Sequence, residues 1–102
     1  MTEKQKPHYD LAAVKAAFAD PTRLNRSFAS RRGAFALDID DAGVVAIVQA
    51  LRISDFDKAM TSYSDHKIWQ DVYKPMRDGR TLYVKFTVDS AGEFLLISFK
   101  ES

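Results

Sequence analysis

The sequence predicts an α+β fold in which a small antiparallel sheet packs against N-terminal helices. Up to about residue 51 the chain is rich in alanine, and its apolar residues recur at helical spacing. From Ser54 onward, aromatic and β-branched residues alternate with polar ones, which is typical of strands. Helices followed by strands indicate this fold class. A chain of 102 residues should form a single domain that spans residues 1–102.

Three segments of the first half are predicted to be helices: residues 10–19, 29–36 and 41–51. The first begins at Asp10, whose carboxylate can cap a helix, and ends before Pro21, because proline disfavours helical geometry in the preceding residue. Asp40 and Asp41 suit the start of the third helix, where acidic groups face the positive end of the helix dipole. Its apolar residues cover more than one face, so we expect it to be the buried central helix.

Strands are expected mainly in the second half of the chain. The predicted strands are residues 22–28, 68–74, 81–88 and 94–100, and residues 55–62 are either a strand or an irregular connection. Pro75 and the Asp78-Gly79 turn close the first clear strand of this half. The segment from Asp89 to Gly92 has the composition of a tight turn, so the last two strands should form a hairpin.

Side-chain alternation restricts the register of this hairpin. A buried face requires apolar residues opposite apolar residues, and a shift by one residue would reverse every side chain. The pairing that meets this condition sets Leu82, Val84 and Phe86 opposite Phe99, Ile97 and Leu95. A four-residue loop allows this in two registers, which pair Tyr83 with either Ser98 or Lys100. In both cases Tyr83 and Lys100 lie together on the other face, and Lys85 joins them.

The face that carries Tyr83, Lys85 and Lys100 has the groups for phosphate chemistry. An ammonium group can stabilise the charge that develops on a phosphate, and a lysine or a phenol with a shifted pKa can move a proton. Phosphates and stacked bases are natural ligands for such a surface. The alternative interpretation is a solvated sheet face that carries lysines for solubility.

Composition excludes several classes of protein. The chain has no cysteine, which rules out a disulfide scaffold, a cysteine-based zinc site and a thiol nucleophile. Two histidines are too few for a His-rich metal cluster. No apolar run approaches the roughly 18 residues that a membrane span needs, and the polar start does not suggest a signal peptide. We therefore expect no membrane association and a cytoplasmic location.

The net charge of +1 is unevenly distributed. Residues 1–37 carry seven basic and three acidic side chains, whereas residues 52–102 are balanced. The arginines of the first third could follow a phosphate backbone or form a solvated positive flank. They are Arg23, Arg26, Arg31 and Arg32. Tyr63, Trp69 and Tyr73 could stack on bases, although packing in the core or at its rim is the usual role of each taken singly.

Other candidate groups have simpler explanations. His66 follows Asp65 and could act as a general base, but no hydrolase motif surrounds it, and a loop histidine beside an aspartate is usually part of a turn. Four aspartates resemble a magnesium cluster, but their spacing fits no ion-binding loop, and we interpret them as solvated charges. They are Asp55, Asp57, Asp65 and Asp71. We therefore predict no metal site.

One long stretch in the second half of the chain is a motif specific enough to indicate a protein family. Residues 54–75 read SDFDKAMTSYSDHKIWQDVYKP, and the last two strands contain LYVK at 82–85 and ISFKE at 97–101. These motifs, with a helix behind a lysine-rich start, resemble the motility quorum-sensing regulator (MqsR) toxin family over nearly the whole chain. The resemblance implies the compact α+β fold of RelE-like messenger-RNA interferases, which is microbial-RNase-like. Residues 20–38 match the family only loosely.

The resemblance also implies an activity and a site. Members of the family are toxins of type II toxin–antitoxin systems, metal-independent endoribonucleases that cleave messenger RNA at GC-containing triplets such as GCU. Carried over by motif, the catalytic residues are Lys58, Gln70, Tyr83 and Lys100. The expected RNA-binding residues are Lys85, Arg23, Arg26, Tyr63 and Trp69. The implied partners are messenger RNA and a cognate antitoxin protein similar to MqsA, with no cofactor and a monomeric free toxin.

Such a site can work without a metal because RNA carries its own nucleophile, the 2′-hydroxyl. We hypothesise that Lys58 or Tyr83 assists the deprotonation of this hydroxyl. Lys100, helped by Lys85, would stabilise the scissile phosphate. Gln70 would orient the phosphate or a base edge, and the products would be a 2′,3′-cyclic phosphate and a 5′-hydroxyl. The alternative hypothesis is a non-catalytic RNA- or protein-binding module on the same fold.

Overall fold

The computed structural model describes residues 2–102, which form three α-helices, a short 3₁₀ helix and six strands. The helices are α1 (Leu11–Ala17), α2 (Phe28–Ala36), α3 (Asp41–Gln49) and the 3₁₀ helix η1 (Ile53–Asp55). The strands are β1 (Glu3–Lys4), β2 (Phe56–Thr61), β3 (Trp69–Tyr73), β4 (Met76–Arg77), β5 (Arg80–Val88) and β6 (Phe94–Glu101). The predicted α+β fold with an antiparallel sheet and N-terminal helices is confirmed.

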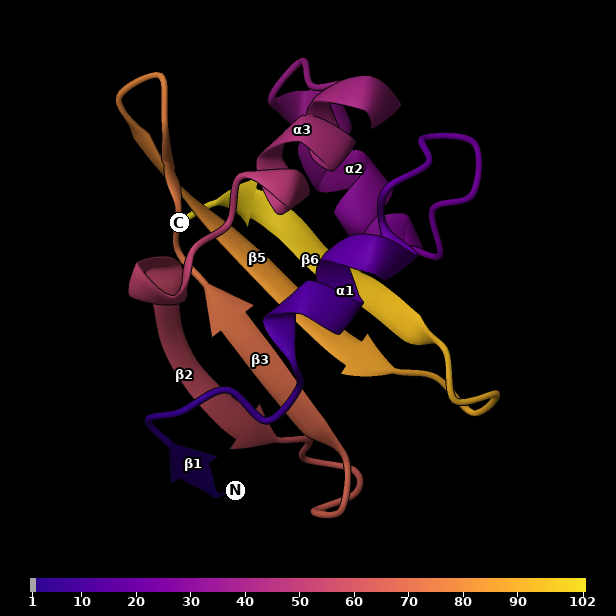
Figure 1. The fold of residues 1–102 in the computed structure, drawn as a ribbon, viewed down its shortest axis with the longest axis vertical. Helices are drawn as coiled ribbons and strands as arrows, with labels where there is room; N and C mark the ends of the chain where they lie inside the picture. Colours follow the sequence, from indigo (N-terminus) through magenta and orange to yellow (C-terminus); the bar gives the residue numbers. More distant parts are fainter. Residues whose placement is uncertain (1) are drawn as a thin grey trace.

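The strand pairs of the described sheet are antiparallel. The strands follow the order β1-β2-β3-β5, and β5 also pairs with β6 along most of its length and with the short β4 at its start. Figure 1 shows the helices gathered over the β5 and β6 side of the sheet, with β1 at the opposite edge. Within residues 2–102, one face of the sheet is covered by helices and the other is not.

Side-chain caps start the three α-helices. The carboxylates of Asp10 and Asp40 and the hydroxyl of Ser27 each accept a hydrogen bond from the backbone N–H group three residues later. These N–H groups have no partner inside a first helical turn, so each cap satisfies one of them. The predicted strand over residues 22–28 is wrong. Ser27 is the cap of α2, and only Arg26 forms an isolated bridge with β6.

The hydrophobic core lies between the helices and one face of the sheet. Its buried residues are Val14, Phe18, Ala34, Val44, Ile47, Val48, Leu51, Tyr73, Leu82, Val84, Phe86, Leu96 and Phe99. Three of them belong to α3, which confirms that this helix is the buried central one. Among residues 2–102, none of the helices could serve as a transmembrane span.

The base of the β5–β6 hairpin has a register that the sequence predicts. Tyr83 pairs with Lys100, which is one of the two predicted pairings. Val84 pairs with Phe99, and both side chains are fully buried in the core. Apolar residues therefore face apolar residues here, and the polar pair points to the opposite side of the sheet.

Nearer the tip of the hairpin, a bulge changes the register. Ile97 is an extra residue on β6, so Phe86 pairs with Leu96 instead of Ile97. The prediction that Leu95 and Ile97 share the buried face is therefore wrong, and Leu96 is the residue that is fully buried. Alternation cannot reveal such a bulge because residues 94–97 are all apolar, and either parity would fill the core.

The N-terminal segment adds a strand that the sequence did not indicate. β1 extends the sheet at the edge of β2, where Glu3 pairs with Met60. The following residues are held by Asp71, whose carboxylate accepts hydrogen bonds from the backbone N–H groups of His8 and Tyr9. The interpretation of Asp71 as a solvated charge is wrong. It is buried on the core side of β3, and this burial raises the pKa of its carboxyl group.

α2 packs directly on β6 at Gly33. A Cβ atom at this position would overlap the backbone carbonyl oxygen of Phe99 and would lie 3.3 Å from the Cβ atom of Lys100. Only glycine allows this approach, because a side chain would push the helix away from the strand. Gly33 therefore brings α2 against the part of β6 that carries Lys100.

We expect Gly33→Ala to lower the free energy of unfolding by about 1–3 kcal/mol, because the added methyl group forces α2 and β6 apart. Denaturant titration measures this quantity. Gly43→Ala in α3 is the matched control, since its Cβ would meet only side-chain atoms, those of Ile39 and Asp40, whereas a Cβ on Gly33 would meet backbone. Alanine is up to about 1 kcal/mol better than glycine in a helix, which offsets these contacts, so the control should lose less stability than Gly33→Ala. Equal losses for both variants would contradict the proposed contact.

Candidate active site

Strand pairing gathers three lysines and a tyrosine on the sheet face that points away from the helices. Lys58 on β2 pairs with Val72 on β3, and Val72 pairs in turn with Lys85 on β5. Two residues before Lys85 on β5, Tyr83 pairs with Lys100 on β6. Paired residues of antiparallel strands point to the same side, and the core residues that alternate with these point to the other. We call Lys58, Tyr83, Lys85 and Lys100 the lysine–tyrosine face.

Two ammonium groups lie close to the ring of Tyr83. The Nζ atom of Lys100 is 5.4 Å from the ring centroid, and the Nζ atom of Lys85 is 5.8 Å from it. Both distances are within the range of a cation–π contact. A phosphate that sits above this part of the sheet would be within reach of the phenol and of both charges.

A buried apolar residue lies beneath these charges. Val72 lies in one row with Lys58 and Lys85, outside the core cluster under the helices, and yet it is fully buried. Its neighbours in the row, Lys58 and Lys85, have long aliphatic stems that can cover an apolar residue between them. Lys85 is itself half-buried. The ammonium group of Lys85 is therefore less solvated than that of an exposed lysine, which strengthens its interaction with a ligand.

Burial and neighbouring charges shift the pKa values of two groups on the lysine–tyrosine face. The pKa of Lys85 is lowered, first by burial and then by the charges of Lys100 and Lys58. The pKa of Tyr83 is raised, because the effect of burial outweighs the attraction of Lys58 for the phenolate. Tyr83 therefore remains a proton donor at neutral pH, and Lys85 gives up its proton more readily than a solvated lysine.

Lys58 has a carboxylate partner that sequence reasoning missed. Its Nζ atom is 3.7 Å from Oε2 of Glu3 on β1, and both side chains are partly exposed. A strand of two residues has no alternation to detect, so the sequence offers no pattern that places Glu3 beside the sheet. The ion pair holds the end of Lys58 toward the β1 edge of the lysine–tyrosine face.

Gln70 lies on this same side of the sheet. It precedes Val72 by two residues on β3, so the two side chains share a face, and it is half-buried. Its partner on β2 is Met60, which follows Lys58 by two residues. The structure therefore puts on one sheet face all the residues that the resemblance assigns to catalysis, namely Lys58, Gln70, Tyr83 and Lys100.

The three aromatic residues considered for base stacking lie apart from that cluster. Trp69 points to the opposite side of β3, where its indole stacks on His8 with 5.1 Å between ring centroids. Tyr73 is buried in the core, and burial raises the pKa of its phenol to about 12. Tyr63 is 91% exposed in the loop between β2 and β3, so it is open to a base.

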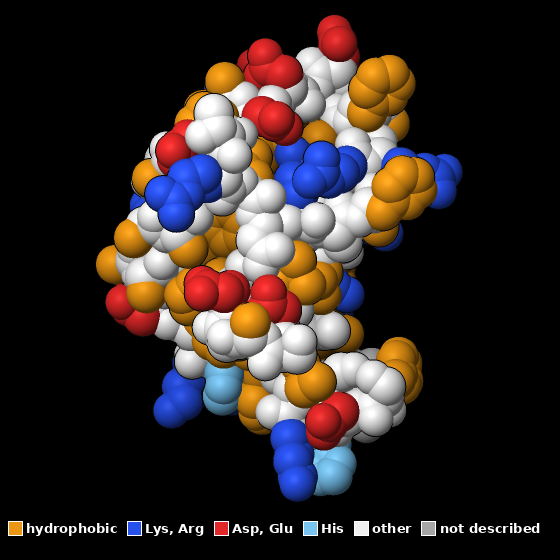
Figure 2. All heavy atoms as spheres, turned by 90° about the vertical axis from the view of Figure 1, so that its right-hand side faces the viewer, with side chains coloured by type: hydrophobic (Ala, Val, Ile, Leu, Met, Phe, Trp, Pro, Cys, Tyr) orange, Lys and Arg blue, Asp and Glu red, His pale blue; other side chains and the backbone are white. Residues whose placement is uncertain are grey.

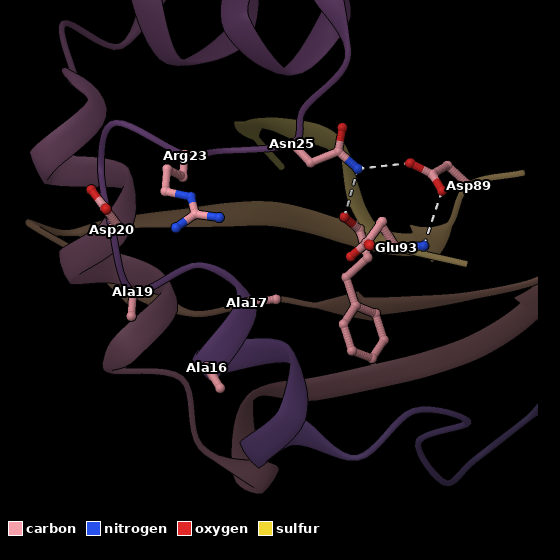
Figure 3. A pocket seen from close by; sticks show the side chains of 9 residues that line it. Ala16, Ala17, Ala19, Asp20, Arg23, Asn25, Asp89 and Glu93 are labelled. Carbon is pink, nitrogen blue, oxygen red and sulfur yellow. Dashed lines mark hydrogen bonds between the residues drawn. The ribbon is translucent and has the colours of Figure 1, made fainter. Parts of the chain in front are cut away.

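The arginines expected to bind RNA also have other surroundings. The side chain of Arg26 is only 3% exposed and donates hydrogen bonds to Ser30 and Asp41, which ties the loop before α2 to two helices. Arg23 lies beside Asp20 in a hollow of about 610 Å³ near the C-terminal end of α1 (Figure 3). This hollow is lined by α1, the loop after it and the β5–β6 turn, and by no residue of the lysine–tyrosine face.

The remaining candidates have structural roles or lie in the loop between β2 and β3. His66 is exposed in that loop, where the Asp65 carboxylate accepts a hydrogen bond from the backbone N–H group of Lys67. This is the turn that the sequence indicates. Asp55 accepts a hydrogen bond at the start of η1, and Asp57 pairs with a lysine. Within residues 2–102, no three metal-ligating side chains come together.

Comparisons with known proteins identify the relatives of this chain. The family described as "Motility quorum-sensing regulator, toxin of MqsA" matches residues 6–101. The chain belongs to this family of MqsR toxins. The mRNA interferase toxin MqsR of Escherichia coli (strain K12) is 42% identical over 100 residues, which cover 97% of this chain and 98% of that relative. The resemblance found in the sequence is therefore confirmed over nearly the whole chain.

The part of the chain that matches the MqsR family contains Gln70 and the whole lysine–tyrosine face. Glu3 lies outside it. In a family of toxins, a face of a small sheet that carries a phenol and three ammonium groups is the natural candidate for the active site. The hollow near α1 has neither the phenol nor the lysines.

The charges on this face predict opposite effects of two substitutions on the pKa of Tyr83. Lys58→Ala removes a positive charge that favours the phenolate and should raise this pKa, whereas Asp57→Asn removes a negative charge and should lower it. NMR titration of the tyrosine ring signals measures both shifts. Lys15→Ala on α1 is the control and should have no effect. An unchanged titration of Tyr83 in Lys58→Ala would contradict the placement of Lys58.

Proposed function

We propose that this chain is a toxin that cleaves messenger RNA, with the lysine–tyrosine face and Gln70 as its active site. One observation carries this proposal: a phenol and several ammonium groups stand together on the free face of the sheet in a member of the MqsR family. The relative from E. coli is named an mRNA interferase toxin. Such groups supply proton transfer and stabilisation of negative charge, which are the two requirements of RNA cleavage.

The nucleophile in this reaction is the 2′-hydroxyl of the RNA. It loses its proton to a base, and its oxygen attacks the adjacent phosphorus. The bond from phosphorus to the 5′-oxygen breaks, and that oxygen takes up a proton. The products are a 2′,3′-cyclic phosphate and a 5′-hydroxyl. Because the substrate brings the nucleophile and ammonium groups meet the charge, no step requires a metal ion.

The pKa shifts support a division of the proton-transfer roles. The raised pKa of Tyr83 suits a group that donates a proton to the leaving 5′-oxygen, and it disfavours the phenolate as the base. Of the two bases that the sequence left open, this favours Lys58. The pKa of Lys85 is lowered by burial and by the neighbouring lysine charges, so this amine gives up its proton more readily than a solvated lysine and is a further candidate for the base. Lys100, with whichever amine remains protonated, binds the scissile phosphate.

Gln70 and Tyr63 contribute binding rather than bond breaking. Gln70 has both a donor and an acceptor, so it can orient the phosphate or a base edge beside the lysines. Tyr63 is exposed in the neighbouring loop and can stack on a base. Arg23, Arg26 and Trp69 lie in the other surroundings described above, and we leave them out of the RNA contacts.

The finer features of the proposal concern specificity and partners. We propose that cleavage prefers GC-containing triplets such as GCU, that the protein acts in the cytoplasm, and that the free toxin is monomeric. A protein antitoxin similar to MqsA would neutralise it, in keeping with the family description. Sequencing of 5′-hydroxyl RNA ends after induced expression tests the triplet preference. A majority of cuts outside GC-containing triplets would refute it.

A non-catalytic RNA- or protein-binding module on the same fold remains the alternative. The charges of the lysine–tyrosine face would also hold RNA without cutting it. The two functions differ in their products, since only the enzyme releases 2′,3′-cyclic phosphate ends. Tight RNA binding by the purified wild-type protein without such ends would favour the module.

We expect Lys100→Ala to lower kcat about 10²–10³-fold, because it removes a charge aimed at the phosphate in the transition state. The side chain is exposed, so the free energy of unfolding should change little. Cleavage of a GCU-containing RNA and growth arrest after induction measure the effect. His66→Ala is the control and should keep wild-type activity. Equal toxicity of Lys100→Ala and the wild type would refute the assigned site.

We also expect cleavage to proceed at an unchanged rate in the presence of a chelator such as EDTA. The reason is that the ammonium groups, and no metal ion, meet the developing negative charge. The measurement is the rate of formation of 2′,3′-cyclic phosphate ends with and without the chelator. Loss of activity that added magnesium restores would contradict this mechanism while leaving the family assignment intact.

A further inference from the structure

The outer side of α2 exposes two aromatic rings and two arginines. Phe28 and Phe35 are 73% and 87% exposed. They are seven residues apart, so their side chains stand on the same side of the helix, two turns from each other. Arg31 and Arg32 lie between them on that side and are exposed. Single exposed apolar residues are ordinary, but a pair of large rings flanking two cations is typical of an interaction site.

The arginines of this surface are available to a ligand. Neither Arg31 nor Arg32 has a carboxylate oxygen within 4.0 Å in residues 2–102. The guanidinium group of Arg32 lies 5.7 Å from the ring centroid of Phe28, so cation and ring already stand together. Arg26, in contrast, is buried and bound to Asp41. The outer side of α2 therefore carries positive charge that these described residues leave without a partner.

This surface adjoins the lysine–tyrosine face. Gly33 of α2 touches β6, where a Cβ atom on Gly33 would lie 3.3 Å from the Cβ atom of Lys100. On a helix about 10 Å across, Arg32 stands between Gly33 and Phe28 around the circumference. Figure 2 shows hydrophobic and basic side chains together at the upper right, above a hollowed part of the outline. Positive side chains thus continue from Lys100 on β6 to Arg32 on α2.

Single-stranded RNA has the chemistry that this surface would recognise. Nucleic-acid bases stack on exposed aromatic rings, and the phosphates between them bind arginine through paired hydrogen bonds. A strand whose scissile phosphate lies at Lys100 has to pass an edge of the sheet, and α2 forms the neighbouring surface at β6. The continuity of positive charge favours RNA over a protein partner at this position.

We infer that Phe28, Arg31, Arg32 and Phe35 on the outer side of α2 bind nucleotides that flank the cleavage site of a single-stranded RNA. The rings stack on bases, and the arginines bind phosphates. This inference rests on the proposed RNA cleavage and extends it, since bond breaking stays with the lysine–tyrosine face. Affinity for longer RNA is then set by a surface outside the active site.

Binding assays test the inference directly. The RNA is a fluorescently labelled single strand with one central GCU triplet, and the protein carries Lys100→Ala so that the strand stays intact. Adding Phe28→Ala and Phe35→Ala together should weaken binding about tenfold or more, the loss expected when bases lose aromatic partners. Adding Arg31→Ala and Arg32→Ala should reduce the slope of log affinity against log salt by about 1.4. Met76→Ala, an exposed apolar residue on β4, should change neither quantity.

Cleavage assays separate this surface from the active site. With Lys100 intact, the double phenylalanine variant should cleave the shortest accepted RNA as fast as the wild type, with the same kcat/KM. On an RNA extended on both sides of the triplet, its kcat/KM should fall about tenfold. Equal losses on both substrates would point to structural damage and overturn the inference, and so would the absence of any loss on the long RNA.

Two further outcomes distinguish this inference from the proposed function. If the α2 variants bind long RNA normally but lose affinity for the antitoxin protein, the surface is a protein interface and the inference is wrong. If the wild type cleaves no RNA, the proposed function fails. The salt dependence of RNA affinity and the affinity lost in the double phenylalanine variant then still decide whether the outer side of α2 binds RNA.

Discussion

The alternation of side chains along β3 and β5 is the constraint on which both the hydrophobic core and the lysine–tyrosine face depend. Val84 and Phe86 point into the core under the helices, so Lys85 between them points to the free face. The same relation holds on β3, where Tyr73 is a core residue and Val72 floors the lysine–tyrosine face. Moving a charge off that face would require exposing a core residue. The hydrophobic core therefore fixes the positions of the charged groups, and no separate scaffold is needed for them.

The edge of the sheet along β6 is closed by the loop before α2 and by α2 itself. Residues 25–27 run beside the first part of β6, where the backbone N–H groups of Ser27 and Leu96 donate to the carbonyl oxygens of Leu96 and Asn25. Gly33 then brings α2 onto the second part of the strand. An open edge would be free to pair with another chain. Here the loop and the helix cover it, and α2 is held at a fixed place beside the lysine–tyrosine face.

Much of the fold and the central part of the candidate site could be predicted from the sequence. Helix starts follow from single capping residues such as Asp10 and Asp40, and parity alone puts Tyr83 and Lys100 on one face. The bulge at Ile97 could not be predicted, because residues 94–97 are all apolar. The burial of Asp71 also escapes the pattern, since its partners are backbone N–H groups about sixty residues away in the chain. Local signals specify local structure, whereas such contacts depend on the assembled sheet.

The hydrogen bonds that Asp71 accepts have a consequence for how the molecule opens. They fix His8 and Tyr9 to the interior of the sheet, while β1 in front of them is held at the edge of β2 by two residue pairs, by the hydrogen bonds between Thr2 and Thr61, and by the Glu3–Lys58 ion pair. The N-terminal segment is thereby divided into a part that can detach by itself and a part that is released only when the sheet unfolds. Detachment of β1 would carry Glu3 away from Lys58 while the rest of the protein stays native. The electrostatic environment of Lys58 would change with that detachment, and amide exchange is expected to be faster in β1 than in residues 8–9.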